Sequence, residues 1–173
     1  MATETLPATT HAVTGNWACS AVGILSDASD ATFATASVTP TGGYLSGTVV
    51  TDTARNSAVD TFNSIAMVVR GRYVLGGSVN LRVEVYDGTS WGDAGFIASW
   101  TTVISTVTLT VATKPSGGAW TTAAVNALQF RISEELTDSS TLEIQEAYAQ
   151  LDYTAGGGGA TLHTVPMMGA GLL

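Results

Sequence analysis

The sequence predicts an all-β protein folded as an antiparallel β-sandwich of about eight strands. Three observations lead to this prediction. Short apolar runs alternate with polar residues at a period of two, and turn-forming residues separate them. Threonine, valine and 19 glycines favour pleated strands joined by turns. No heptad repeat and no helical period of any length appears along the chain.

The first half of the chain carries three predicted strands after an N-terminal arm. Residues 1–14 are small, polar and aperiodic, so we expect them to lie outside the sandwich. Strands are predicted at residues 32–38, at 47–52 and at 63–73, each bounded by turn-forming residues. The third is apolar on both faces, which predicts a strand that is covered on both sides.

The second half carries the more regular strands. Residues 79–86 alternate strictly, and Asp87 and Gly88 then supply a turn in which positive φ is tolerated. Residues 103–111 repeat the alternation, with valine and leucine facing inward and threonine facing outward. A helical turn is predicted over residues 121–127, because the first threonine can cap it.

Two further strands, at residues 128–132 and 142–153, close the domain. The last one is apolar at one parity up to Ile144 and at the other parity from Ala147 onward. A β-bulge near Gln145 would produce such a one-residue slip. We expect the core to include Ile65, Met67, Leu81, Val83, Leu109, Leu128, Phe130 and Leu151.

Composition excludes several function classes. The 173 residues carry 14 acidic and six basic side chains, for a net charge of −8. We expect no nucleic-acid partner, since binding phosphates requires clustered basic residues. No run approaches the roughly 20 apolar residues of a membrane span, and the N-terminus does not resemble a secretory signal. We therefore expect a protein made in a cytoplasm, without a membrane partner. The single cysteine, Cys19, rules out an internal disulfide and is expected to be a small core residue.

Few residues suggest reactive chemistry. Asp27 and Asp30 share one loop that could bind Ca²⁺, but without an EF-hand pattern a turn explains them better. His11 and His163 lie in the presumed tails, where a general base could not be held within reach of a substrate. We therefore predict no enzymatic activity, no cofactor and no metal.

The tryptophans are better candidates for a binding role, because aromatic rings stack on sugars. Trp91 follows the predicted hairpin turn and is the candidate for glycan contact, whereas Trp17 and Trp120 are expected to anchor the core. Glu134 and Glu135 precede a polar turn, so a solvated loop explains them better than a glycosidase pair, which needs partners across a cleft.

Several segments resemble the jelly-roll domains of tailed-bacteriophage virion proteins. They are Trp17 with residues 25–33, Trp120 with residues 126–132, and residues 144–153. Similar tryptophan, Asp-rich turn and closing tyrosine patterns also occur in lectin-like and carbohydrate-binding sandwiches. The resemblance implies a jelly-roll sandwich and supplies no catalytic residues.

The resemblance covers residues 15–154, which we take as the sandwich domain, between the arm at 1–14 and a Gly-rich hinge with an apolar tail at 155–173. It implies a non-enzymatic virion structural protein, above all a capsid decoration (cement) protein assembled in the bacterial host cytoplasm and located on the capsid exterior or the tail. The expected partners are the major capsid protein or other virion proteins, and further copies of the chain in a homotrimer. The alternative is a carbohydrate- or receptor-binding module of a phage tail or fibre.

The C-terminal tail is so apolar that its exposure to water is unfavourable, and it is too short to fold alone. Each buried side chain contributes about 1.5 to 3 kcal/mol, while ordering each residue costs about 1 to 2 kcal/mol, so docking needs the multivalency of an assembled particle. Four glycines at 156–159 give the tail the freedom to reach a neighbouring subunit. The expected assembly contact consists of Leu162, Val165, Met167, Met168, Leu172 and Leu173.

Deletion of residues 160–173 should therefore leave the sandwich folded with an unchanged melting temperature, while incorporation into particles falls. Calorimetry measures the first quantity, and the amount of chain in purified particles measures the second. Full incorporation of the shortened chain would remove the tail from the mechanism.

Overall fold

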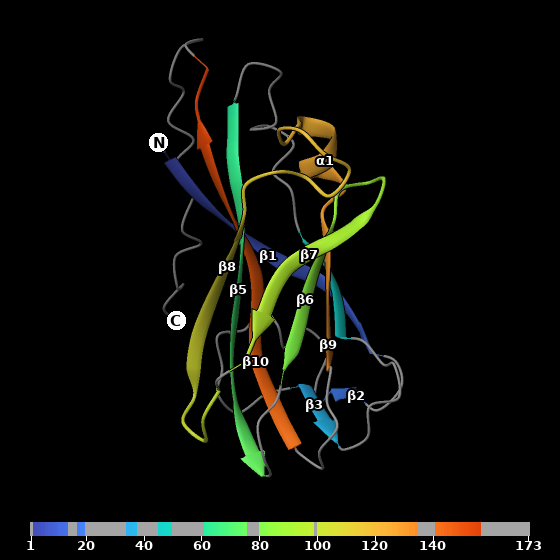
Figure 1. The fold of residues 1–173 in the computed structure, drawn as a ribbon, viewed down its shortest axis with the longest axis vertical. Coiled ribbons are helices and arrows are strands. Elements are labelled where there is room, and N and C mark those ends of the chain that lie inside the picture. Colours follow the sequence, from blue (N-terminus) through green and yellow to red (C-terminus); the bar gives the residue numbers. More distant parts are fainter. Residues whose placement is uncertain are drawn as a thin grey trace, which may run out of the picture.

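A computed structural model describes most of the predicted sandwich and shows two antiparallel sheets that face each other (Figure 1). The described residues are 2–13, 17–19, 34–37, 45–49, 61–75, 80–98, 100–134 and 141–156. They form ten strands and one short helix. The predicted all-β, antiparallel sandwich is confirmed.

Sheet A is built around the two longest strands. β10 (Thr141–Thr154) pairs along its length with β5 (Thr61–Leu75), and β8 (Ser105–Val111) pairs with the other side of β5. The second side of β10 pairs with β3 (Ala34–Ser37), which in turn pairs with β2 (Trp17–Cys19). β10 therefore lies in the interior of the sheet.

Sheet B contains the strands that carry the candidate site. Its order is β4, β9, β6 and β7, with each neighbouring pair antiparallel. The bounds of these strands are Leu45–Val49 for β4, Gln129–Glu134 for β9, Leu81–Tyr86 for β6 and Trp91–Ile97 for β7.

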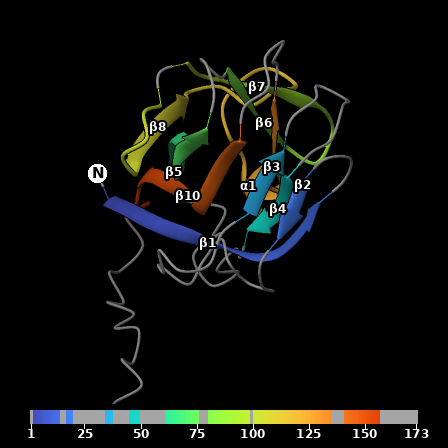
Figure 2. The ribbon, with the colours of Figure 1, turned by 90° about the horizontal axis from the view of Figure 1, so that it is seen from below.

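A single strand, β1 (Ala2–Val13), belongs to both sheets. Residues 2–7 pair with β10 and residues 8–13 pair with β4, with a shift of register between Ala8 and Thr10. Figure 2 shows β1 passing from beside β10 to beside β4. The expectation that residues 1–14 form an arm is therefore wrong for residues 2–13. An edge strand is held by backbone pairing and needs little apolar pattern, and Leu6 is the one buried residue among those of β1 whose burial is described.

The inward faces of both sheets supply one hydrophobic core. Ile65 and Met67 of sheet A and Leu81, Val83 and Phe130 of sheet B are fully buried in it. Leu128 and Leu151 are also buried, whereas Leu109 is half-buried at the margin, because β8 is an edge strand. The predicted core is thus confirmed except that Leu109 packs against its rim.

The predicted bulge in the last strand is confirmed. The pairing of β10 with β5 shifts between Ile144 and Glu146, which leaves Gln145 as the extra residue. The buried parity changes accordingly, from Leu142 and Ile144 to Ala147 and the alternate residues after it. A straight strand would have turned one of these two sets out of the core.

The predicted helix and its cap are confirmed, whereas the strands β2 and β7 were not predicted. The helix α1 (Thr122–Asn126) forms in the predicted place, and the Thr121 hydroxyl accepts a hydrogen bond from the Ala124 N–H at 3.3 Å. β7 was missed because two glycines and an aspartate interrupt any alternation; its strand geometry comes from pairing with β6.

The core predicts a clear contrast between two phenylalanines. Phe130→Ala should lower the free energy of unfolding by about 3 to 5 kcal/mol, because the ring is fully buried and its removal leaves a cavity. Phe96→Ala, at a ring that is 48% exposed, should change it by less than about 1 kcal/mol. Urea denaturation measures both, and equal losses would contradict the assigned burial.

Candidate functional site

The outer face of sheet B gathers aromatic and charged side chains in three rows. Alternation on β6 buries Leu81, Val83 and Val85 and turns the intervening residues outward. The register of β7 and β9 then places one residue of each beside every outward residue of β6. We call this set the polar–aromatic face; its rows are Tyr86 with Trp91 and Gln129, Glu84 with Asp93 and Arg131, and Arg82 with Phe96 and Ser133.

The first row holds a cross-strand aromatic pair. The ring centroids of Tyr86 and Trp91 are 5.3 Å apart, and the rings are tilted by 35°. The guanidinium carbon of Arg131 lies 4.4 Å from the centroid of the Trp91 ring, which is a cation–π contact. Trp91 is half-buried, so the aromatic pair is fixed in orientation and still reaches the surface.

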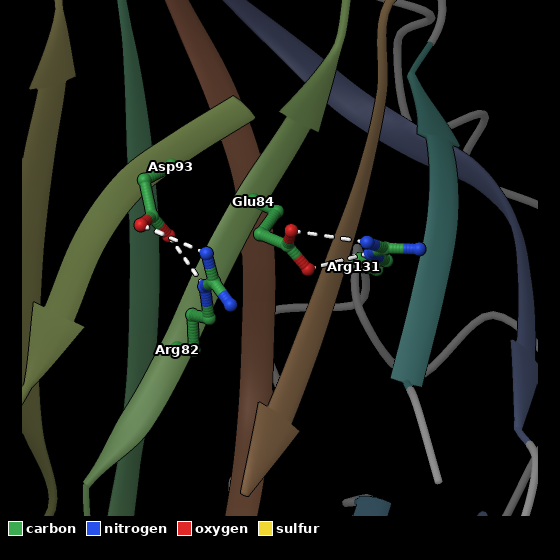
Figure 3. A network of polar contacts seen from close by, with 4 residues as sticks. All are labelled: Arg82, Glu84, Asp93 and Arg131. Atoms are coloured by element: carbon green, nitrogen blue, oxygen red, sulfur yellow. Dashed lines mark hydrogen bonds and ion pairs between the residues drawn. The ribbon is translucent and has the colours of Figure 1, made fainter. Parts of the chain in front are cut away.

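The second and third rows hold two bidentate ion pairs, drawn in Figure 3. Arg131 donates from Nε and Nη2 to the two carboxylate oxygens of Glu84, at 2.6 and 3.0 Å. Arg82 donates in the same way to Asp93, at 2.7 and 3.0 Å. Glu84 is only 7% exposed, and a carboxylate so far removed from water needs this partner. The side chains of Arg82 and Asp93 are 37% and 43% exposed, so their pair mainly fixes geometry.

Two properties of the face follow from these pairs. The four charges cancel, so the face is close to neutral although the chain carries a net charge of −8. At the end of the face away from Trp91, Phe96 is 48% exposed, one of three large hydrophobic side chains so exposed in the described part of the chain. The face therefore offers apolar rings at both ends and polar groups between them.

The hairpin turn beside Trp91 is held by a buried carboxylate. Oδ1 of Asp87 accepts hydrogen bonds from the N–H groups of Thr89 and Ser90, each at 2.9 Å, and Oδ2 accepts one from the N–H of Ser116 at 2.7 Å. Gly88 has φ of +89°, as predicted for this turn. Burial raises the pKa of Asp87, but hydrogen bonds from the Ser116 side chain and from these backbone N–H groups outweigh it and hold the pKa well below its usual range.

A shallow pocket of about 250 Å³ lies at this end of the sandwich. Its walls come from the Asp87 turn, from the segment around Lys114 and Ser116, and from α1. Nζ of Lys114 lies 2.5 Å from the Ser116 hydroxyl oxygen, so the lining is polar on one side, while alanines of α1 form the other. The turn that lines the pocket, residues 87–89, belongs to the same hairpin as Trp91.

The structure shows where some of the predicted residues lie, while others fall outside the described residues. Trp91 lies on the polar–aromatic face. Trp120 is buried and donates from Nε1 to the Val111 carbonyl at 2.9 Å, as expected of a core anchor. His11 lies in β1 opposite Gly47. The side chains of Trp17, Cys19, His11 and Glu134, and all of Asp27, Asp30, Glu135, His163 and the tail residues from Leu162 to Leu173, lie outside the description.

Within the residues that are described, no group of three or more His, Cys, Asp or Glu side chains could hold a metal ion. The same part of the chain contains no helix long and apolar enough to cross a membrane.

Sequence reasoning did not bring together the partners of Trp91. The alternation of residues 79–86 placed Arg82, Glu84 and Tyr86 on one outer face, which is confirmed. Asp93, Phe96 and Arg131 join them only through the pairing of β6 with its neighbours. No local pattern encodes that register, although the position of Trp91 after an Asp-Gly turn predicted this end of the hairpin as a place for contact.

Comparison with known structures finds the same fold in carbohydrate-binding modules. The CBM22-1 xylan-binding domain from Paenibacillus barcinonensis is similar with a TM-score of 0.51 at 10% identity, over 86% of this chain and 92% of that one. A Clostridium thermocellum endo-1,4-beta-D-xylanase structure containing CBM22-1 and GH10 modules, complexed with xylohexaose, gives 0.50 at 8% identity, over 90% of this chain and 28% of that one. A family 35 carbohydrate-binding module from Clostridium thermocellum gives 0.45 at 13% identity, over 87% and 98%.

The likenesses with TM-scores of 0.51 and 0.50 show a shared sandwich fold of the jelly-roll type, as predicted. Comparison of the sequence with protein-family models and with curated proteins gives no match.

The hydrogen bonds of Asp87 predict a pH-dependent loss of stability. Folding lowers the pKa of this carboxyl, so its contribution is fully present above the ordinary value of about 3.9 and is lost as the pH falls below it. Asp87→Asn should lower the free energy of unfolding by about 1 to 3 kcal/mol at pH 7. The difference from the wild type should shrink below about pH 4.

Denaturant titrations between pH 3 and pH 7 measure this difference. Asp93→Asn, at the exposed ion pair, is the matched control and should have a much smaller effect. Equal stability of Asp87→Asn and the wild type at pH 7 would contradict the role given to the carboxylate.

Proposed function

We propose that this chain is a non-catalytic carbohydrate-binding module and that the polar–aromatic face is its contact surface. The observation that carries the proposal is the pair of tilted rings of Tyr86 and Trp91, held by Arg131 on the outer face of a sheet. The apolar C–H face of a sugar ring packs on such a platform, and a platform already held in place loses little entropy on binding.

The ion pairs supply the polar half of the recognition. A sugar presents hydroxyl groups, which need acceptors at fixed positions. The Asp93 carboxylate is 43% exposed and is oriented by both of its bonds to Arg82, and a carboxylate can accept further hydrogen bonds on its remaining lone pairs. Because the charges of the face cancel, the ligand that it fits best is a neutral saccharide.

The same pairs favour binding over hydrolysis. Glu84 and Asp93 lie side by side in one row, but each is held by two hydrogen bonds to an arginine. A glycosidase needs two carboxyl groups that flank the scissile bond, one to protonate the leaving oxygen and one to attack or activate water. Two carboxylates on one flat sheet face do not flank a bond.

The similar structures suggest the first ligands to try. One of them is a xylan-binding domain, and another was solved with xylohexaose. Xylan and xylohexaose are therefore the first probes, followed by other neutral plant and bacterial polysaccharides.

Trp91→Ala should weaken saccharide binding by about tenfold or more, since loss of the stacking contact removes about 1.4 kcal/mol. Isothermal titration with xylohexaose and affinity electrophoresis in polysaccharide gels measure the change. Val103→Ala is the matched control, because Val103 is 70% exposed but precedes β8 of the other sheet. An unchanged affinity for Trp91→Ala, or wild-type protein that binds none of the saccharides, would refute the proposal.

A virion structural protein is the second candidate, favoured by the neutral outer face of β8. Thr106, Thr108 and Thr110 are exposed there, and such hydroxyl-lined surfaces suit contact with identical neighbours. In that case the chain is a decoration protein on the capsid exterior or a tail component. Its partners are then the major capsid protein or other virion proteins and further copies in a trimer. Copy number in purified particles distinguishes the two candidates, since a free carbohydrate-binding module would not copurify with capsids.

A further inference from the structure

The edge strands of the described sandwich differ in how they are protected against pairing with another chain. Proteins usually block such edges with a proline, a charge, a bulge or a very short strand. β1 contains Glu4 and Pro7, and β2 has only three residues. β7 carries Asp93 and a register shift in its pairing with β6, and Pro115 packs closely on Gly92. Three of these four edges therefore carry at least one protective feature.

The fourth edge, β8, has none of these features. Its seven residues contain no proline, glycine or charged side chain, and it pairs with β5 without any shift of register. Five of the seven are β-branched, which favours strand pairing. Among the described strands, β8 pairs with β5 alone, so the backbone groups on its outer side have no strand partner there. Figure 1 shows β8 at the margin of sheet A.

The surroundings of β8 are suited to a second copy of the same chain. Each copy carries a net charge of −8, so two copies repel each other unless they meet at a neutral surface. Residues 101–113, which include the whole of β8, contain no charged side chain. Val103, just before the strand, is 70% exposed and adds apolar area to the same edge.

We propose that β8 pairs antiparallel with β8 of a second copy, across a twofold axis at Thr108, to join two sheets A into one continuous sheet. A twofold axis perpendicular to a sheet pairs residues of equal parity, so inward residues meet inward residues. Centring the axis on Thr108 pairs all seven residues. Thr106 then lies opposite Thr110 of the other copy on the exposed face, and the half-buried Val107 lies opposite Leu109.

This register can be tested by exchanging charges across the axis. T106K/T110K places like charges opposite each other twice and should raise the dimer dissociation constant by about tenfold or more. T106E/T110K places opposite charges there and should remain within about threefold of the wild type. T61K/T89K adds the same charge as the first variant at exposed threonines outside β8 and should not weaken the dimer.

Sedimentation equilibrium at micromolar to millimolar concentration measures these constants. A wild-type monomer throughout this range, or a trimer, overturns the proposal. A dimer that T106K/T110K leaves intact overturns it as well, and equal losses in T106K/T110K and T106E/T110K overturn the register.

A covalent test does not depend on the strength of association. The two Thr108 Cα atoms of the proposed pair lie about 4.5 to 5.5 Å apart, which is within the range that a disulfide spans. T108C in a C19S background should therefore form a disulfide-linked dimer under mild oxidation, while T89C in the same background should not. Failure of T108C to cross-link, or equal cross-linking of T89C, overturns the proposal. None of these results depends on saccharide binding.

Discussion

The antiparallel pairing of β5 with β10 determines where the other strands of sheet A can lie. β10 carries β1 and β3 on its second side, and β5 carries β8, so sheet A extends outward from these two strands. The pairing works only with the bulge at Gln145, which lets residues on both sides of it bury their apolar side chains. The extra residue thus allows apolar side chains on both sides of it, along a strand of 14 residues, to point into the same core.

Sheet B uses its pairing differently, to bring surface side chains together. Glu84 is buried and needs Arg131, and Arg131 in turn lies over Trp91, which packs beside Tyr86. These side-chain contacts connect β6, β7 and β9 in addition to their backbone pairing. In the proposed binding module, the contact surface is therefore already in place before a saccharide binds, so little entropy is lost on binding.

Features set by residues close together in the sequence could be predicted, whereas features set by the pairing of distant strands could not. The alternation of residues 79–86 and the change of buried parity near Gln145 are patterns of neighbouring residues, and both were predicted correctly. β1, β2 and β7 were missed because short, polar or glycine-containing segments become strands only when they pair with the backbone of a neighbouring strand. For the same reason Trp91 could be named as a candidate from the sequence, while its neighbour Arg131, 40 positions along the chain, could not.

The sharing of β1 between the two sheets has a consequence for how the domain comes apart. In many sandwiches one sheet can loosen while the other persists, because side-chain packing alone connects them. Here one strand pairs with β10 of one sheet and with β4 of the other, so removal of the whole of β1 takes backbone hydrogen bonds from both sheets at once. We therefore expect detachment of this strand to weaken both layers together.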